Sequence, residues 1–148
     1  MKRFLLAFSA CLLLSAAAFA QTAAELETLL GADAVSYGQA ARLVLNAANV
    51  ADASPESAFR HAMEMGWLPA GATQDAAAKL DGVSLLVMRA FGMRGGALYT
   101  LMKTPHYAYR ELMYQNVIQG RADPGMAVSG DLLLFVVSRA LERKEGGQ

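Results

Sequence analysis

Apolar residues recur along this chain at the three- and four-residue spacing of amphipathic helices. The clearest sets begin at Ala40, Val83 and Leu133, and each continues at positions i+3, i+4, i+7 and i+8, which places it on one face of a helix. The chain is also rich in Ala, Leu and Met, which favour helix. The pattern predicts six helices, over about residues 22–31, 37–48, 54–66, 81–91, 104–116 and 129–141. We therefore expect an all-α fold.

Residues suited to helix ends stand at the ends of these patterns. Ser54-Pro55 and Thr104-Pro105 each place a hydroxyl at the N-cap and a proline at the first helical position, where both residue types are favoured. Gly66 and Asn116 follow the same two helices. Glycine and asparagine best tolerate the left-handed conformation that ends a helix, so we expect both helices to stop there.

An internal repeat relates these helices. Residues 54–91 align without a gap on residues 104–141 at a shift of fifty, and ten of the 38 pairs are identical. The helix over 37–48 matches the one over 81–91 at an offset of 43. Chance similarity is the competing explanation, because all alanine-rich amphipathic helices share one period. We interpret the chain as three helix–loop–helix units that pack on one another. The units cover about residues 22–50, 54–93 and 104–143, within one domain over 21–143, and residues 144–148 form a flexible tail.

The N-terminal residues have the three parts of a secretory signal. A basic Met1-Lys2-Arg3 precedes an apolar stretch over 4–17, and Ala18-Phe19-Ala20 is a typical cleavage site. We expect residues 1–20 to be removed and the protein to be exported to the periplasm or cell envelope. Cys11 offers an alternative, a lipoprotein acylated at that residue, which would tether the domain to a membrane.

Composition excludes several classes of function. The chain after Ala20 has no cysteine, and its 11 basic and 13 acidic residues give a net charge near −2. It therefore cannot form a disulfide, and it lacks the basic excess that general nucleic-acid binding needs. No later apolar stretch reaches the length of a transmembrane helix. We expect neither nucleic acid nor a bilayer-spanning segment to play a part.

The third unit resembles an S-layer homology module. The resemblance rests on residues 108–141, a helix, a loop containing Gly and Asp, and a second helix ending in Arg139-Ala-Leu. Residues 62–69 and 85–91 match more loosely, and residues 41–47 more faintly still. The resemblance implies a compact bundle of about six helices with pseudo-threefold symmetry, and attachment to cell-wall polysaccharide in grooves between modules. The Thr-Arg-Ala-Glu motif that the family ties to glycan binding is absent from all three units, and a scaffold can persist while its ligand changes or is lost.

Five residues are candidates for ligand binding: Trp67, Tyr107, Arg110, Arg121 and Asp123. Arg121 lies in a turn-rich loop, and a guanidinium group can pair with a carboxylate of an acidic glycan or peptide. Aromatic rings such as Trp67 and Tyr107 can hold a sugar ring. Each also has a structural interpretation: a solvated arginine, aromatic residues in the core, and Asp123 as a turn former.

No catalytic motif is present. His61 and His106 have no further ligands at metal-binding spacing, and no nucleophile–base pair can be named. We therefore expect neither catalysis, a metal nor a cofactor. Two functions remain open. The chain is a cell-envelope protein that binds wall polysaccharide, peptidoglycan or an envelope protein, or it is a small exported adaptor that binds a protein and has no affinity for glycan.

Overall fold

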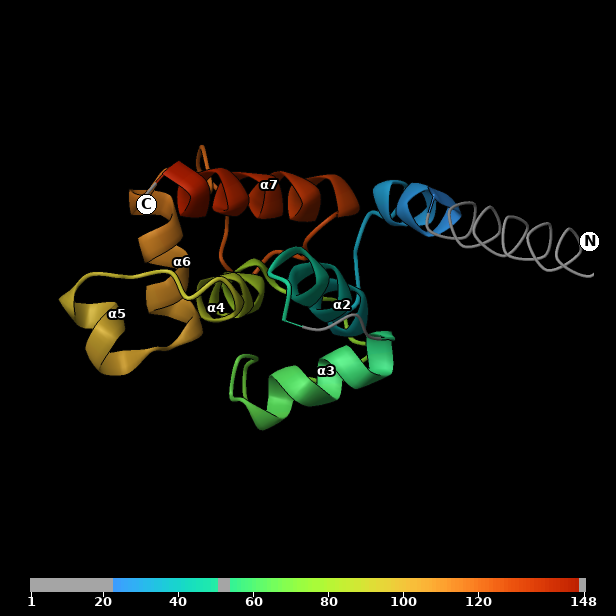
Figure 1. The fold of residues 1–148 in the computed structure, drawn as a ribbon, viewed down its shortest axis with the longest axis horizontal. Helices are drawn as coiled ribbons and strands as arrows, with labels where there is room; N and C mark the ends of the chain where they lie inside the picture. The colour runs from blue at the N-terminus through green and yellow to red at the C-terminus, as the bar shows by residue number, and fades with distance from the viewer. Residues whose placement is uncertain (1–22, 51–53, 147–148) are drawn as a thin grey trace, which may run out of the picture.

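The computed structural model describes residues 23–50 and 54–146, which fold into one all-α bundle (Figure 1). A helix over residues 23–30 comes first. The remaining helices are α2 (Tyr37–Ala47), α3 (Pro55–Glu64), α4 (Leu80–Ala90), α5 (Ala97–Met102), α6 (Pro105–Tyr114) and α7 (Gly130–Gly146). The expected signal peptide over residues 1–20 and the alternative acylation site at Cys11 lie outside the described residues.

The predicted caps form as the sequence suggested. The hydroxyls of Ser54 and Thr104 accept hydrogen bonds from the backbone three residues on, at 3.3 and 3.4 Å. Ser36 forms a full capping box with Gln39 at the start of α2. Gly66 and Asn116 have φ values of 66° and 57°, so both take the left-handed conformation expected of them. These local signals fix where the helices begin and end.

A ring of three hydrogen bonds joins the three units at the centre. The N–H of Val35 donates to Val128 O at 2.8 Å, that of Val128 to Ala78 O at 2.9 Å, and that of Ala78 to Val35 O at 2.8 Å. All three residues are fully buried. Their spacings along the chain are the same 43 and 50 residues that relate the repeats. The ring therefore confirms the pseudo-threefold arrangement.

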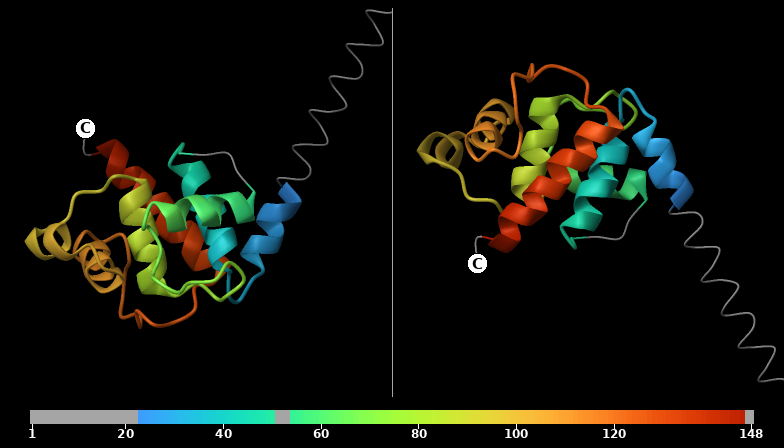
Figure 2. Two further views of the ribbon diagram at one scale, coloured as in Figure 1. Left: turned by 90° about the horizontal axis from the view of Figure 1, so that it is seen from below. Right: turned by 90° about the horizontal axis from the view of Figure 1, so that it is seen from above.

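The second helices of the units, α2, α4 and α7, each begin two residues after a member of this ring. Each pair of them is in contact, and Figure 2 shows α7 lying beside both α2 and α4. Val44, Val87 and Val137 occupy equivalent repeat positions and are all buried. A tandem repeat predicts that Val87 and Val137, fifty residues apart, are buried alike, and both are.

First helices pack across unit boundaries. The main partner of α3 is α2, from the preceding unit, and the main partner of α6 is α4 in the same way. One unit thus buries its apolar stripe against its neighbours, as expected for a tandem repeat. The core runs through all three units.

Two parts of the chain differ from the sequence prediction. Helix α5 was not predicted, and its six residues lie within the segment over 94–103 that separates units two and three. The tail expected over residues 144–148 is helical as far as Gly146, because residues 142–145 contain no Gly or Pro that would stop α7. In α4 the equivalent stop is Gly92, with φ 61°, and the repeat places Glu142 at that position.

Candidate functional site

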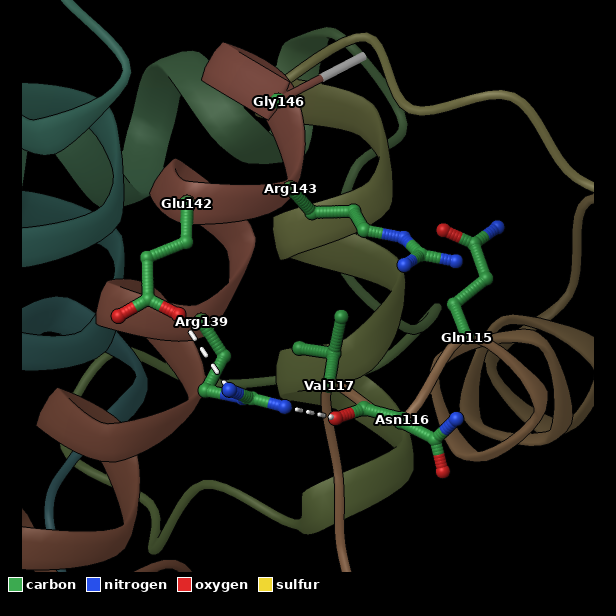
Figure 3. Close-up of a pocket in the computed structure, with 7 residues that line it drawn as sticks. All are labelled: Gln115, Asn116, Val117, Arg139, Glu142, Arg143 and Gly146. Atoms are coloured by element: carbon green, nitrogen blue, oxygen red, sulfur yellow. Dashed lines mark hydrogen bonds and ion pairs between the residues drawn. The ribbon is translucent and has the colours of Figure 1, made fainter.

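The end of α6 and the last turns of α7 enclose a polar groove of about 610 Å³, which we call the α6–α7 groove (Figure 3). Its lining residues are Gln115, Asn116, Val117, Arg139, Glu142, Arg143 and Gly146. Two arginines and one glutamate give the groove an excess of positive charge. It can therefore receive an anionic group.

The groove exists because α7 is longer than its repeat counterpart α4. Helix α4 has 11 residues and α7 has 17. The extra turns carry Glu142 and Arg143 out alongside the chain that leaves α6. The wall that these residues form has no equivalent in unit two, where α4 has already ended.

Arg139 is held in place within the groove. Its Nη2 donates to the backbone carbonyl of Asn116 at 3.2 Å, and its Nη1 lies 3.3 Å from Glu142 Oε2. The left-handed conformation of Asn116 forms part of the turn that ends α6. Because the Arg139 side chain is 36% exposed, the ion pair adds little stability. Its chief effect is to orient the guanidinium group.

Arg143 lies one turn further along α7 and is exposed. Figure 3 shows its guanidinium group extending toward the side chain of Gln115 across the groove. The amide of Gln115 is itself fixed, since its Nε2 donates to Glu111 Oε1 at 2.9 Å and to Arg94 O at 2.8 Å. The groove thus sets a cation opposite a positioned amide, a combination suited to a carboxylate with neighbouring hydroxyls.

A second groove, the α2 groove, lies between the 23–30 helix and α2. It measures about 520 Å³ and has a more apolar lining, which includes Leu26, Leu29 and Leu43. An ion pair of 2.8 Å between Arg42 and Glu25 crosses its edge. Asn46 also lines it, and the Oδ1 of this residue is a buried acceptor with no hydrogen-bond partner among the described residues.

The five residues singled out from the sequence line neither groove. Trp67 is half-buried and packs edge-on against His61, with ring centroids 5.7 Å apart. Tyr107 is half-buried at the start of α6, beside His106. Each ring therefore pairs with a histidine of its own unit, and among the described residues the two rings do not pair with each other.

The three polar candidates are exposed. Arg121 and Asp123 share the loop between α6 and α7, and Asp123 Oδ1 accepts from Gly125 N at 2.8 Å, as a turn former does. Arg110 lies on α6. The residues of the α6–α7 groove escaped the sequence analysis because Arg143 lies beyond the helix predicted over residues 129–141 and Asn116 was interpreted only as a helix stop. The available signal was that no Gly or Pro occurs between Leu141 and Gly146.

The described residues hold no group of three or more His, Cys, Asp or Glu side chains that could bind a metal ion. None of the helices over 23–50 and 54–146 is long and apolar enough to cross a bilayer. No family model, no curated protein and no solved structure matches the chain.

Proposed function

We propose that this chain is a non-catalytic protein of the cell envelope whose helical domain binds carboxylate-bearing wall glycan in the α6–α7 groove. Peptidoglycan has the chemistry that the groove would recognise, since its sugars carry hydroxyls and its peptides carry carboxylates. The proposal includes export and removal of residues 1–20. The domain acts as a binding module and performs no reaction.

The observation that carries this proposal is the pair of guanidinium groups on one wall of the groove. Arg139 is oriented by Asn116 O and Glu142, and Arg143 lies open to solvent beside it. An anion placed between them would meet two cations without any rearrangement of Arg139. Preorganised donors of this kind raise affinity by lowering the entropic cost of binding. The three-unit scaffold, which resembles S-layer homology modules, supports the same assignment.

Co-sedimentation with purified peptidoglycan sacculi tests the proposal. Residues 21–148 include the whole described core and serve as the starting protein. We expect it to sediment with sacculi and Arg143→Gln to bind at least about fivefold more weakly, the loss typical of one exposed charge-assisted contact. Arg60→Gln is the matched control, because Arg60 is an exposed arginine on α3 in another unit. This variant should bind as the parent does.

Arg121→Ala in the same assay tests the loop arginine chosen from the sequence. Weaker binding by this variant, with full binding by Arg143→Gln, would move the site to the loop between α6 and α7. Parent protein that stays in the supernatant would contradict glycan binding altogether.

The α2 groove favours a second function, that of an adaptor for a protein. Its leucine lining suits an apolar side chain, and the unpartnered Oδ1 of Asn46 could accept a backbone N–H from a bound peptide. Leu43→Asp would disrupt this groove and leave the α6–α7 groove intact. A chain that ignores sacculi but binds an envelope protein in a manner sensitive to Leu43→Asp would be the adaptor.

A further inference from the structure

Helix α5 presents an unusually exposed apolar surface. Leu98, Leu101 and Met102 are 55%, 81% and 52% exposed. They lie on the insertion between units two and three, which projects from one end of the bundle (Figure 1). Since the repeat closes its core without this segment, the three side chains are not needed to complete the core.

The insertion is nevertheless held firmly. Tyr99 is buried beneath it and packs against Gly95, where an added Cβ would clash with the ring. The N–H of Gly96 donates to Glu111 Oε2 at 2.9 Å, and Gln115 Nε2 donates to Arg94 O at 2.8 Å. The exposed leucines therefore stand on a fixed platform rather than on a loose loop.

Positive charge surrounds this platform. Between Asp81 and Glu111 the chain contains four Lys or Arg residues and no acidic residue, although the chain after Ala20 carries more acid than base. Arg94 and Lys103 bracket α5 directly, and both are exposed. Glu111 is the acidic residue beside the platform, where its carboxylate accepts from Gly96 N, so the two exposed cations, Arg94 and Lys103, outnumber one anion. The face of α5 is thus apolar at its tip and cationic at its base.

This arrangement suits a lipid surface better than a protein partner. Stable protein interfaces bury about 800 Å² on each side, and a single projecting turn with three aliphatic side chains offers far less. A bilayer requires only that a few apolar side chains enter the acyl boundary while cations meet anionic headgroups. Lys and Arg at the edge of the apolar tip are placed to make that second contact.

We propose that α5 docks the domain peripherally on an anionic membrane surface, with Leu98, Leu101 and Met102 inserted and Arg94 and Lys103 on the headgroups. This surface is separate from both grooves and does not depend on the proposed glycan binding. It would place the domain at the interface of a membrane that it does not span.

Vesicle co-sedimentation of residues 21–148 tests the proposal. We expect binding to vesicles of equal parts phosphatidylglycerol and phosphatidylcholine, and much weaker binding to phosphatidylcholine alone. Leu98→Asp/Leu101→Asp should reduce partitioning by about a hundredfold, since each leucine contributes about tenfold. Arg94→Gln/Lys103→Gln should reduce it by about tenfold or more, and added salt should weaken the parent's binding.

Phe135→Asp is the matched control, because Phe135 is 43% exposed on α7, away from α5 (Figure 1). It should bind vesicles as the parent does, and circular dichroism should show all variants folded. Equal binding by the parent and by Leu98→Asp/Leu101→Asp, or no binding by the parent, would overturn the proposal. Sedimentation velocity tests whether the parent protein forms a dimer. If it does, and if Leu98→Asp/Leu101→Asp is a monomer, α5 is a self-association surface and the membrane proposal is wrong.

Discussion

Gly130→Ala perturbs the joint that closes the three units into a ring. Gly130 is the first residue of α7, and its N–H donates to Ala32 O at 2.9 Å. A Cβ at this position would lie 1.6 Å from the backbone O of Leu29 and 2.5 Å from its carbonyl carbon. Both atoms belong to the backbone at the end of the 23–30 helix, so no side-chain rotation can relieve the overlap. The alanine must push unit three away from unit one.

The cost follows from the size of that displacement. Ordinary contact needs roughly 3.4 Å or more, so the two segments must separate by well over 1 Å, and overpacking of this kind costs about 1–3 kcal/mol. Because rigid backbone must move, we expect a loss at the upper end of this range, about 3 kcal/mol of the free energy of unfolding. That corresponds to a fall in Tm of about 10 °C for a domain of this size. Thermal unfolding followed by circular dichroism measures it.

Two other glycines separate the steric effect from the conformational one. Gly146 has open space around it near the end of α7, so Gly146→Ala should change stability by less than about 0.5 kcal/mol. Gly92 also has open space, but its φ is 61°, and Gly92→Ala should cost about 1 kcal/mol through backbone strain alone. If Gly130→Ala proves no more destabilising than Gly92→Ala, the close contact between Gly130 and the backbone of Leu29 does not hold units one and three together.

Two further predictions concern stability. Asn116→Ala should lower the free energy of unfolding by about 1 kcal/mol, because Asn116 has φ 57°, whereas Asn116→Gly should be neutral or slightly stabilising. Urea denaturation of both variants checks this, and an equal loss of stability in both would contradict it. Burial raises the pKa of Tyr37 above its usual 10.0, so above about pH 10 the unfolded state loses a proton that the folded state keeps, and the free energy of unfolding falls. Tyr37→Phe should make that fall shallower without abolishing it, because burial raises the pKa of Tyr99 as well; unchanged steepness between about pH 9 and pH 11 would refute the assignment.

Most of the fold could be predicted because its signals are local. Ser36, Ser54 and Thr104 are caps in the structure as in the sequence, and the repeat offsets locate the second helices. The ring of Val35, Ala78 and Val128 could not be derived residue by residue, since backbone pairing leaves no side-chain signature. Helix α5 was missed because its six residues, Ala97–Met102, are too few for a periodic pattern.

The candidate site was harder to predict than the fold because its signals are not local. Choosing Trp67 and Arg121 relied on residue type, which says what a side chain could bind but not which surface it lines. The α6–α7 groove depends on how far α7 runs past its repeat counterpart and on where α6 ends beside it. That relation joins residues more than twenty positions apart, as the bond from Arg139 to Asn116 O illustrates.

The α6–α7 groove and the surface of α5 both lie where the chain departs from the repeat. The buried positions that the units share serve the core and the central ring, so a change at one of them would disturb the joints between units. The insertion that forms α5 and the extension of α7 leave those joints intact, and they flank α6 on different sides. Gln115 connects them, because it lines the groove and its Nε2 holds Arg94 O at the base of the insertion. A variant of Gln115 would therefore disturb both surfaces at once, whereas Arg143 and Leu101 each belong to one surface and test the two proposals separately.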